Sequence, residues 1–178
     1  MLSMDTTVSG GFSGFKGRIS SPALQAIAEH WQIVRADKTM PAWSDLSPSA
    51  LSSHLKRLWA FNCDRVTGDF TARLAGTRVM MGFGQSFRGT PLKDLHPPHV
   101  FQRCHANLTR AVSEPAIYWG GGNLFKVGNQ IIAGERIVLP LASDGRHGDG
   151  VLGASDFQYP ATTGPVELIH DQIEWFSI

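Results

Sequence analysis

The sequence predicts an α+β fold: a five-stranded antiparallel sheet with a helical crossover on one face and flanking helices at the N-terminal side. Two segments with helical spacing come first, and a pair of short alternating segments follows them. A long amphipathic segment then separates that pair from three further strand-like segments. Because the pair forms a hairpin and the last three strands are consecutive, we expect antiparallel neighbours throughout the sheet.

Proline and polar side chains mark where the predicted helices begin and end. Ser21-Pro22 and Ser47-Pro48 each place a capping side chain before a proline at the first helical position. Pro97-Pro98 precedes the crossover helix at 98–113, and Glu114-Pro115 ends it. These signals predict two leading helices and one long crossover helix.

Five strands are predicted from alternation and from turn residues. Their expected ranges are 58–64, 70–74, 115–125, 134–142 and 151–159. A turn at Val66-Thr67-Gly68-Asp69 joins the first two strands into a hairpin. The third strand is expected to bend at its glycine run, and a long connection over 125–134 is expected to lead into the fourth.

The chain is expected to hold one domain with two short extensions. Residues 1–20 are rich in Gly, Ser and Thr and predict a flexible N-terminal arm. Residues 21–160 form the domain, which includes the leading helices. Residues 161–178 form an amphipathic tail, for which apolar residues at helical spacing predict a short helix.

The composition excludes several classes of function. The formal net charge of the 178 residues is +1, so no broad basic field favours a nucleic-acid partner. No apolar run reaches the roughly 18 residues of a spanning helix, and the N-terminus lacks a secretion signal. The only two cysteines, Cys63 and Cys104, fit a reducing compartment. We therefore expect a cytoplasmic protein without membrane or nucleic-acid partners.

Short motifs from the middle of the chain to its last strands resemble those of one family. Leu74-Ala75-Gly76-Thr77 leads directly from a strand into a short helix at 77–83, and Gly89 precedes Leu92-x-x-Leu95. The segment Glu135–Gly145 and then Leu152-Gly153-Ala154 follow in order, and Trp31 and Met40-Pro41 belong to the leading part. Together these motifs resemble a family of stand-alone bacterial PAS-like sensor domains.

The resemblance implies a sensory or interaction module with one small hollow and one sheet face for protein contacts. We expect it to bind an unknown small molecule, or none, between the sheet and the helix at 98–113. We also expect an unknown signalling protein as partner. Leu24, Ile27 and Trp31 form an apolar stripe on the first helix, which predicts a homodimer interface together with the outer sheet face.

Five side chains are predicted to contact the ligand: Phe101, Cys104, His105, Trp119 and Arg136. The first three lie on or beside the apolar stripe of the crossover helix, and Trp119 is one of several aromatic residues on strands. Arg136 precedes the most apolar strand, and its forked donors suit an acidic ligand. Arg73 has similar potential, and for both arginines a solvent-facing position is the alternative.

No resident cofactor or metal is predicted. In haem-binding PAS domains the axial histidine comes from the crossover region, and the resemblance therefore points to His105 or His99 as haem ligands. The sequence shows no clamp for the haem propionates, so a partly buried, hydrogen-bonded histidine is the favoured interpretation. Paired cysteine motifs for zinc are missing, and neither Cys63 nor Cys104 lies in a flavin motif.

Two alternatives to a sensor stay open. A curved antiparallel sheet with helices on one side also builds cone-shaped isomerases and dehydratases, in which Asp156 or His105 would act as general base. Because enzyme signature motifs are fragmentary in this chain, we expect no enzymatic activity. The other alternative is a passive adaptor whose core is completely filled.

Overall fold

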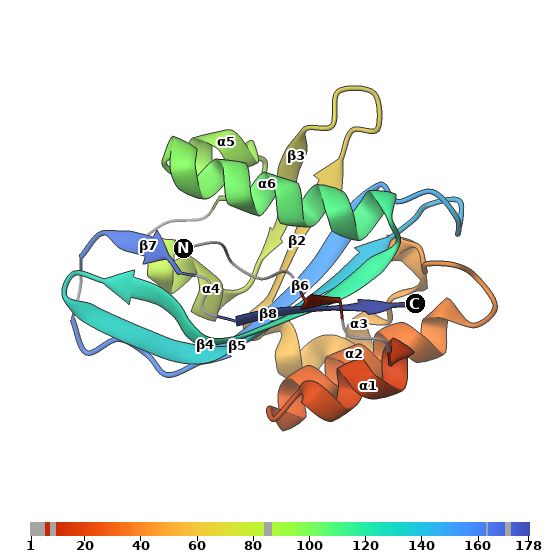
Figure 1. Cartoon of the computed structure of the whole chain (residues 1–178), viewed down its shortest axis with the longest axis horizontal. Coiled ribbons are helices and arrows are strands. Elements are labelled where there is room, and N and C mark those ends of the chain that lie inside the picture. Colours follow the sequence, from red (N-terminus) through yellow and green to blue (C-terminus); the bar gives the residue numbers. More distant parts are fainter. Residues whose placement is uncertain (1–5, 8–9, 84–86, 163, 170–171) are drawn as a thin grey trace.

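The computed structural model describes residues 6–7, 10–83, 87–162, 164–169 and 172–178. Within them a curled, mostly antiparallel sheet lies between two layers of helices (Figure 1). The predicted α+β fold class is confirmed. The helices are α1 (Gly11–Arg18), α2 (Pro22–Arg35), α3 (Pro48–Leu51), α4 (Thr77–Phe83), α5 (Leu92–Leu95) and α6 (Pro98–Ser113), with short 3-10 turns at Trp43–Asp45 and Ser52–Arg57.

The five predicted strands are neighbours in the sheet, from β4 to the edge strand β3. The sheet order is β1-β8-β4-β5-β6-β2-β3, with β7 also paired to β4. The strands are β1 (Thr6–Thr7), β2 (Leu58–Cys63), β3 (Phe70–Ala75), β4 (Ala116–Val127), β5 (Gln130–Leu141), β6 (Gly150–Phe157), β7 (Val166–Leu168) and β8 (Gln172–Ser177). Apart from the parallel pair β1 and β8, all neighbours are antiparallel.

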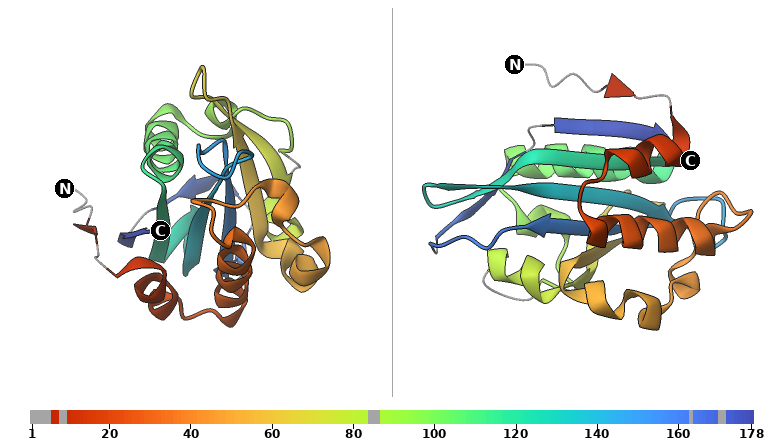
Figure 2. Two further views of the ribbon diagram at one scale, coloured as in Figure 1. Left: turned by 90° about the vertical axis from the view of Figure 1, so that its right-hand side faces the viewer. Right: turned by 90° about the horizontal axis from the view of Figure 1, so that it is seen from below.

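Helices α1 and α2 cover one face of the sheet, which we call the outer face (Figure 2). Leu24, Ile27 and Trp31 of α2 are fully buried against the apolar side chains of that face. The Trp31 indole also donates a hydrogen bond to the Pro140 carbonyl oxygen at 2.9 Å. The stripe expected at a dimer interface is therefore buried within the protomer, because the sheet itself supplies the surface that it needs.

Helices α4, α5 and α6 lie over the opposite, inner face. The buried side chains of α6 are Val100, Leu108, Ala111 and Val112. Leu108, Ala111 and Val112 pack with apolar side chains of β2, β3, β4, β5 and β6 in a second core. The sheet thus separates two cores, one under each helical layer.

Part of the predicted flexible arm is a packed helix. Residues 11–18 form α1, and its Phe15 is fully buried with its ring 5.7 Å from that of Phe176 on β8. The high content of small residues predicted flexibility, but the segment also contains Phe12 and Phe15, which pack this helix against the core. For this segment the prediction of a mobile arm is wrong.

The tail contains strands, and the predicted helix in it is wrong. β8 pairs with β4 along its whole length, and β7 pairs with the far end of β4. Trp175 is buried in the inner core and Phe176 in the outer one, so β8 is covered on both faces. Because a strand covered on both faces does not alternate, its apolar spacing resembled that of a helix.

The bend predicted at the glycine run of β4 is confirmed. Gly122 has a φ of +83°, and the register with β5 shifts between Asn123 and Phe125. The long connection expected over 125–134 is instead the end of a hairpin, since β4 and β5 stay paired as far as Val127 and Gln130. Among the described residues, none of the helices combines the length and hydropathy of a bilayer-crossing segment.

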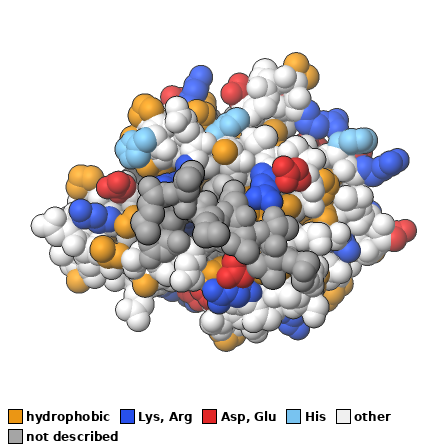
Figure 3. Space-filling view, in the orientation of Figure 1, with side chains coloured by type: hydrophobic (Ala, Val, Ile, Leu, Met, Phe, Trp, Pro, Cys, Tyr) orange, Lys and Arg blue, Asp and Glu red, His pale blue; other side chains and the backbone are white. Residues whose placement is uncertain are grey.

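Charged side chains of both signs are interspersed on the face of the molecule seen in Figure 3. This distribution agrees with the formal net charge of +1.

Candidate functional site

A cavity of about 100 Å³ lies between the inner face of the sheet and the helices α4, α5 and α6. Its wall is largely aromatic and aliphatic, and its rings come from three different strands and from the segment before α5: Trp59, Phe61, Tyr118, Phe125, Phe157 and Phe87. Leu108 of α6 and Leu92 and Leu95 of α5 add aliphatic surface. A mostly apolar wall with a few polar groups is typical of small-molecule sites.

Arg136 is the charged side chain of this wall. On β5 the side chains of Ile137, Leu139 and Leu141 point to the outer core, so Arg136 points inward. Its residue is only 9% exposed, and its Nε lies 3.4 Å from the Ser155 hydroxyl oxygen. The ion pairs formed among the described residues do not include Arg136.

A short series of hydrogen bonds orients the Arg136 side chain. The Trp59 indole donates a hydrogen bond to the Ser155 hydroxyl oxygen at 3.1 Å, and that oxygen also faces Arg136. Tyr118, which is fully buried, shares a hydrogen bond with Arg136. Burial is the largest influence on this phenol and raises its pKa, so Tyr118 stays neutral near pH 7.

His96 contributes an uncharged ring to the cavity. Burial, and then the nearby charge of Arg136, lower the pKa of His96 to about 4. The imidazole is therefore neutral near pH 7. Arg136 is consequently the only charged side chain among the described residues of the cavity wall.

Asn107 and Cys104 of α6 complete the polar part of the wall. The Asn107 side-chain nitrogen is buried and has no hydrogen-bond partner. Burial raises the pKa of the Cys104 thiol, so this group is protonated.

The model of the PAS domain family matches residues 19–155, which include both leading helices and the central five strands. The chain belongs to the PAS domain family. Comparison with curated proteins and with solved structures found no match. Family membership makes this a sensory or regulatory domain in the general sense, without indicating its signal.

Of the five predicted ligand contacts, Cys104 and Arg136 line the cavity of this PAS domain. Phe101 and His105 pack beside it: the His105 ring lies against Phe70 and Phe101, and its Nε2 is 2.9 Å from the Gly68 carbonyl oxygen. The favoured reading of His105 as a partly buried, hydrogen-bonded side chain agrees with this geometry. Neither His105 nor the exposed His99 lines the cavity, so neither of the two predicted histidines is placed to ligate a haem there.

Trp119 lies on the outer face. The Arg18 guanidinium stacks on its ring at 3.9 Å, and its Nε1 donates to Glu135 at 3.2 Å. Tyr118 and Trp119 are adjacent on β4 and therefore point to opposite faces. Because both faces of β4 are covered, the sequence does not show whether Tyr118 or Trp119 faces the cavity. The sequence analysis selected Trp119, whereas the structure places Tyr118 there.

Asp156 is unsuited to be a general base. It forms an ion pair with Arg57 at 3.1 Å and accepts a hydrogen bond from the Ser21 hydroxyl at 2.6 Å. Partial burial alone would raise its pKa, but these partners lower it overall. Asp156 lies outside the cavity, whose described wall contains no carboxylate to pair with a histidine.

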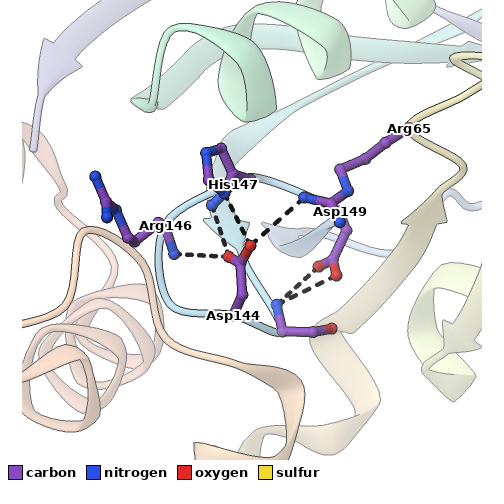
Figure 4. A network of polar contacts seen from close by, with 6 residues as sticks. Arg65, Asp144, Arg146, His147 and Asp149 are labelled. Carbon is purple, nitrogen blue, oxygen red and sulfur yellow. Dashed lines mark hydrogen bonds and ion pairs between the residues drawn. The ribbon is translucent and has the colours of Figure 1, made fainter.

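A second polar cluster occupies the exposed loop between β5 and β6 (Figure 4). Asp144 accepts hydrogen bonds from the backbone N–H groups of Arg146 and His147, contacts the His147 ring and lies 3.5 Å from Arg65. The two backbone donors, and then the ring, hold the pKa of Asp144 well below its usual range. These bonds close the loop, and no group of three metal-ligating side chains was found among the described residues.

Proposed function

We propose that this PAS domain is a cytoplasmic sensory module that binds a small molecule in the cavity under α6. The observation that carries the proposal is the buried Arg136 in a cavity lined mostly by aromatic and aliphatic side chains. A passive adaptor would gain stability from a filled core, since cavities and unpaired buried charges both cost free energy. The cavity and its arginine therefore favour a ligand site. Neither Cys63 nor Cys104 forms a disulfide among the described residues, which is consistent with a reducing compartment.

The signal would pass through a shift between two positions of α6 relative to the sheet. A ligand changes such an equilibrium only if it binds one position more tightly. The bond between His105 and the Gly68 carbonyl connects α6 to the β2–β3 turn. At that turn Val66 is 95% exposed, which supports a protein contact there.

A homodimer remains part of the proposal, with an interface outside the buried stripe of α2. Ile33 near the C-terminal end of that helix is an exposed apolar side chain that supports such a contact. Analytical ultracentrifugation tests it. Sedimentation as a strict monomer at all concentrations would remove the dimer from the proposal.

Native mass spectrometry of the purified protein, with extraction of bound small molecules, tests the ligand site. Leu108→Trp places an indole in the cavity, whereas Ala106→Trp adds the same group on the exposed side of α6. We expect bound mass in the wild type and in Ala106→Trp, and its loss in Leu108→Trp. Equal ligand retention by Leu108→Trp would contradict the proposed site.

A further inference from the structure

We infer that the ligand of this cavity is a small apolar monocarboxylate, whose carboxylate pairs with Arg136 while its hydrocarbon part lies against the aromatic wall. The inference rests on the proposed function, because it names the chemical class of the ligand in that same site. Its starting point is a charge that the protein buries without an anionic partner among the described residues.

A buried guanidinium is expensive when only neutral groups surround it. Ser155 and Tyr118 contact Arg136, but neither carries a negative charge near neutral pH. Neutral hydrogen bonds recover only part of the lost hydration of an ion. An arriving carboxylate would supply the missing charge and accept two parallel N–H bonds from the fork of the guanidinium.

The net charge of the side chains that line the cavity favours a ligand with a single negative charge. His96 is neutral near pH 7, so Arg136 alone is positive among the described lining residues. A dianion such as a phosphate monoester would bring an excess charge into an apolar space. A neutral ligand would leave the guanidinium without a counter-charge. A monocarboxylate balances it.

Asn107 provides a second, independent indication of a polar ligand atom. Its Nδ2 is buried at the cavity and has no hydrogen-bond partner. A buried donor without an acceptor costs free energy, and at the cavity wall a ligand acceptor would recover it. A carboxylate oxygen, or a carbonyl or hydroxyl elsewhere on the acid, is an acceptor of the required kind.

The remaining wall sets the size and character of the acid. Phe61, Leu92, Leu108 and Val138 present only hydrocarbon surface. The volume of about 100 Å³ lies below the roughly 300–1,000 Å³ of sites for larger ligands. Short fatty acids and simple aromatic acids meet both conditions, and hexanoate and benzoate are suitable probes.

Isothermal titration calorimetry of the wild-type protein with hexanoate, hexan-1-ol and hexylammonium provides the first test. The three probes share one hydrocarbon chain and differ in headgroup charge. We expect hexanoate to bind at least roughly tenfold more tightly than hexan-1-ol, as a charge-assisted hydrogen-bonded pair requires. Hexylammonium should not bind detectably. This comparison needs no variant, so a folding defect cannot obscure it.

Arg136→Met provides the second test, with Arg73→Met as the matched control. Arg73 is also a strand arginine, but it lies outside the cavity, stacked on Trp43 at 4.4 Å. Arg136→Met should weaken hexanoate binding about tenfold or more while leaving hexan-1-ol unaffected or improved. Arg73→Met should change neither affinity. Arg136→Lys should bind hexanoate with intermediate affinity, because it keeps the charge but loses the fork.

The outcomes separate this inference from the proposed function. If hexan-1-ol binds as tightly as hexanoate, or if Arg136→Met binds hexanoate normally, the acid assignment is wrong while the cavity remains a ligand site. A co-purifying ligand that proves to be neutral or cationic would have the same meaning. If no probe binds and no bound mass is found, both proposals fail together.

Discussion

Each face of the sheet buries an apolar core, but the polar side chains compared below are satisfied differently on the two faces. On the outer face the Trp31 indole, the Ser21 cap and Asp156 all have well-placed partners. On the inner face a cavity remains, and Arg136 and Asn107 line it without full compensation. Because the cavity and the buried Arg136 lie on the inner face, we propose that the inner core holds a ligand and that the outer core maintains the fold.

The largest expected effect tests the outer core. Trp31→Ala should lower the free energy of unfolding by about 3–5 kcal/mol, because it leaves a large void and removes the bond to Pro140. Urea denaturation measures this loss. Ile33→Ala on the same helix, where the side chain is 74% exposed, should stay within about 0.5 kcal/mol of wild type. Similar losses in both variants would contradict a structural role for the stripe.

Gly153→Ala tests the packing between the sheet and the cavity. A Cβ at this position would overlap the Trp59 indole, which must then move toward the cavity and away from Ser155. We expect a loss of about 1–3 kcal/mol in the free energy of unfolding, from overpacking. Tryptophan fluorescence should also change, and hexanoate affinity should fall. Unchanged affinity would mean that Trp59 does not help to orient Arg136.

His96 predicts a pH dependence of stability that arises at the cavity on the inner face. Its pKa is lowered from 6.5 to about 4 in the folded state, so the unfolded state binds the proton first as the pH falls. Stability is therefore lost between about pH 6.5 and pH 4. Between pH 7 and pH 5 we expect this residue to account for about 1 kcal/mol, allowing for its partial exposure.

Urea midpoints of the wild type and of His96→Asn at those two pH values measure the contribution of His96. The variant should lose less stability on acidification. Parallel losses in the two proteins would show that the His96 ring is not held in its neutral form by its surroundings.

The smallest expected effect concerns Arg136 in the ligand-free protein. Arg136→Met should change the free energy of unfolding by less than about 1 kcal/mol. The variant loses the hydrogen bonds of Arg136, but it also removes a buried charge that has no counter-charge among the described residues, and the two effects offset each other. A loss above about 2 kcal/mol would identify Arg136 as a structural residue of the inner core. Denaturation with added hexanoate should then separate the variants, since only the wild type would be stabilised.

Capping residues, prolines and alternation predicted those helices and strands whose ends and buried faces depend on a few neighbouring residues. Ser21-Pro22 and Pro97-Pro98 marked the starts of α2 and α6, and alternation located the five central strands. The glycine run in β4 predicted the bend that Gly122 makes. Arg136 could be proposed as an acid-binding residue because its chemistry is visible in its side chain.

The sequence by itself thus determined the class of fold and the chain order of the leading helices, the crossover helix and the strands β2 to β6, and it placed Arg136 among the candidate ligand contacts. Only the tertiary structure decided that Tyr118 faces the cavity and Trp119 does not, that β8 is a strand, and that the α2 stripe is buried by its own sheet. The reason is that a sheet covered on both faces removes the polar and apolar alternation from which sidedness is predicted.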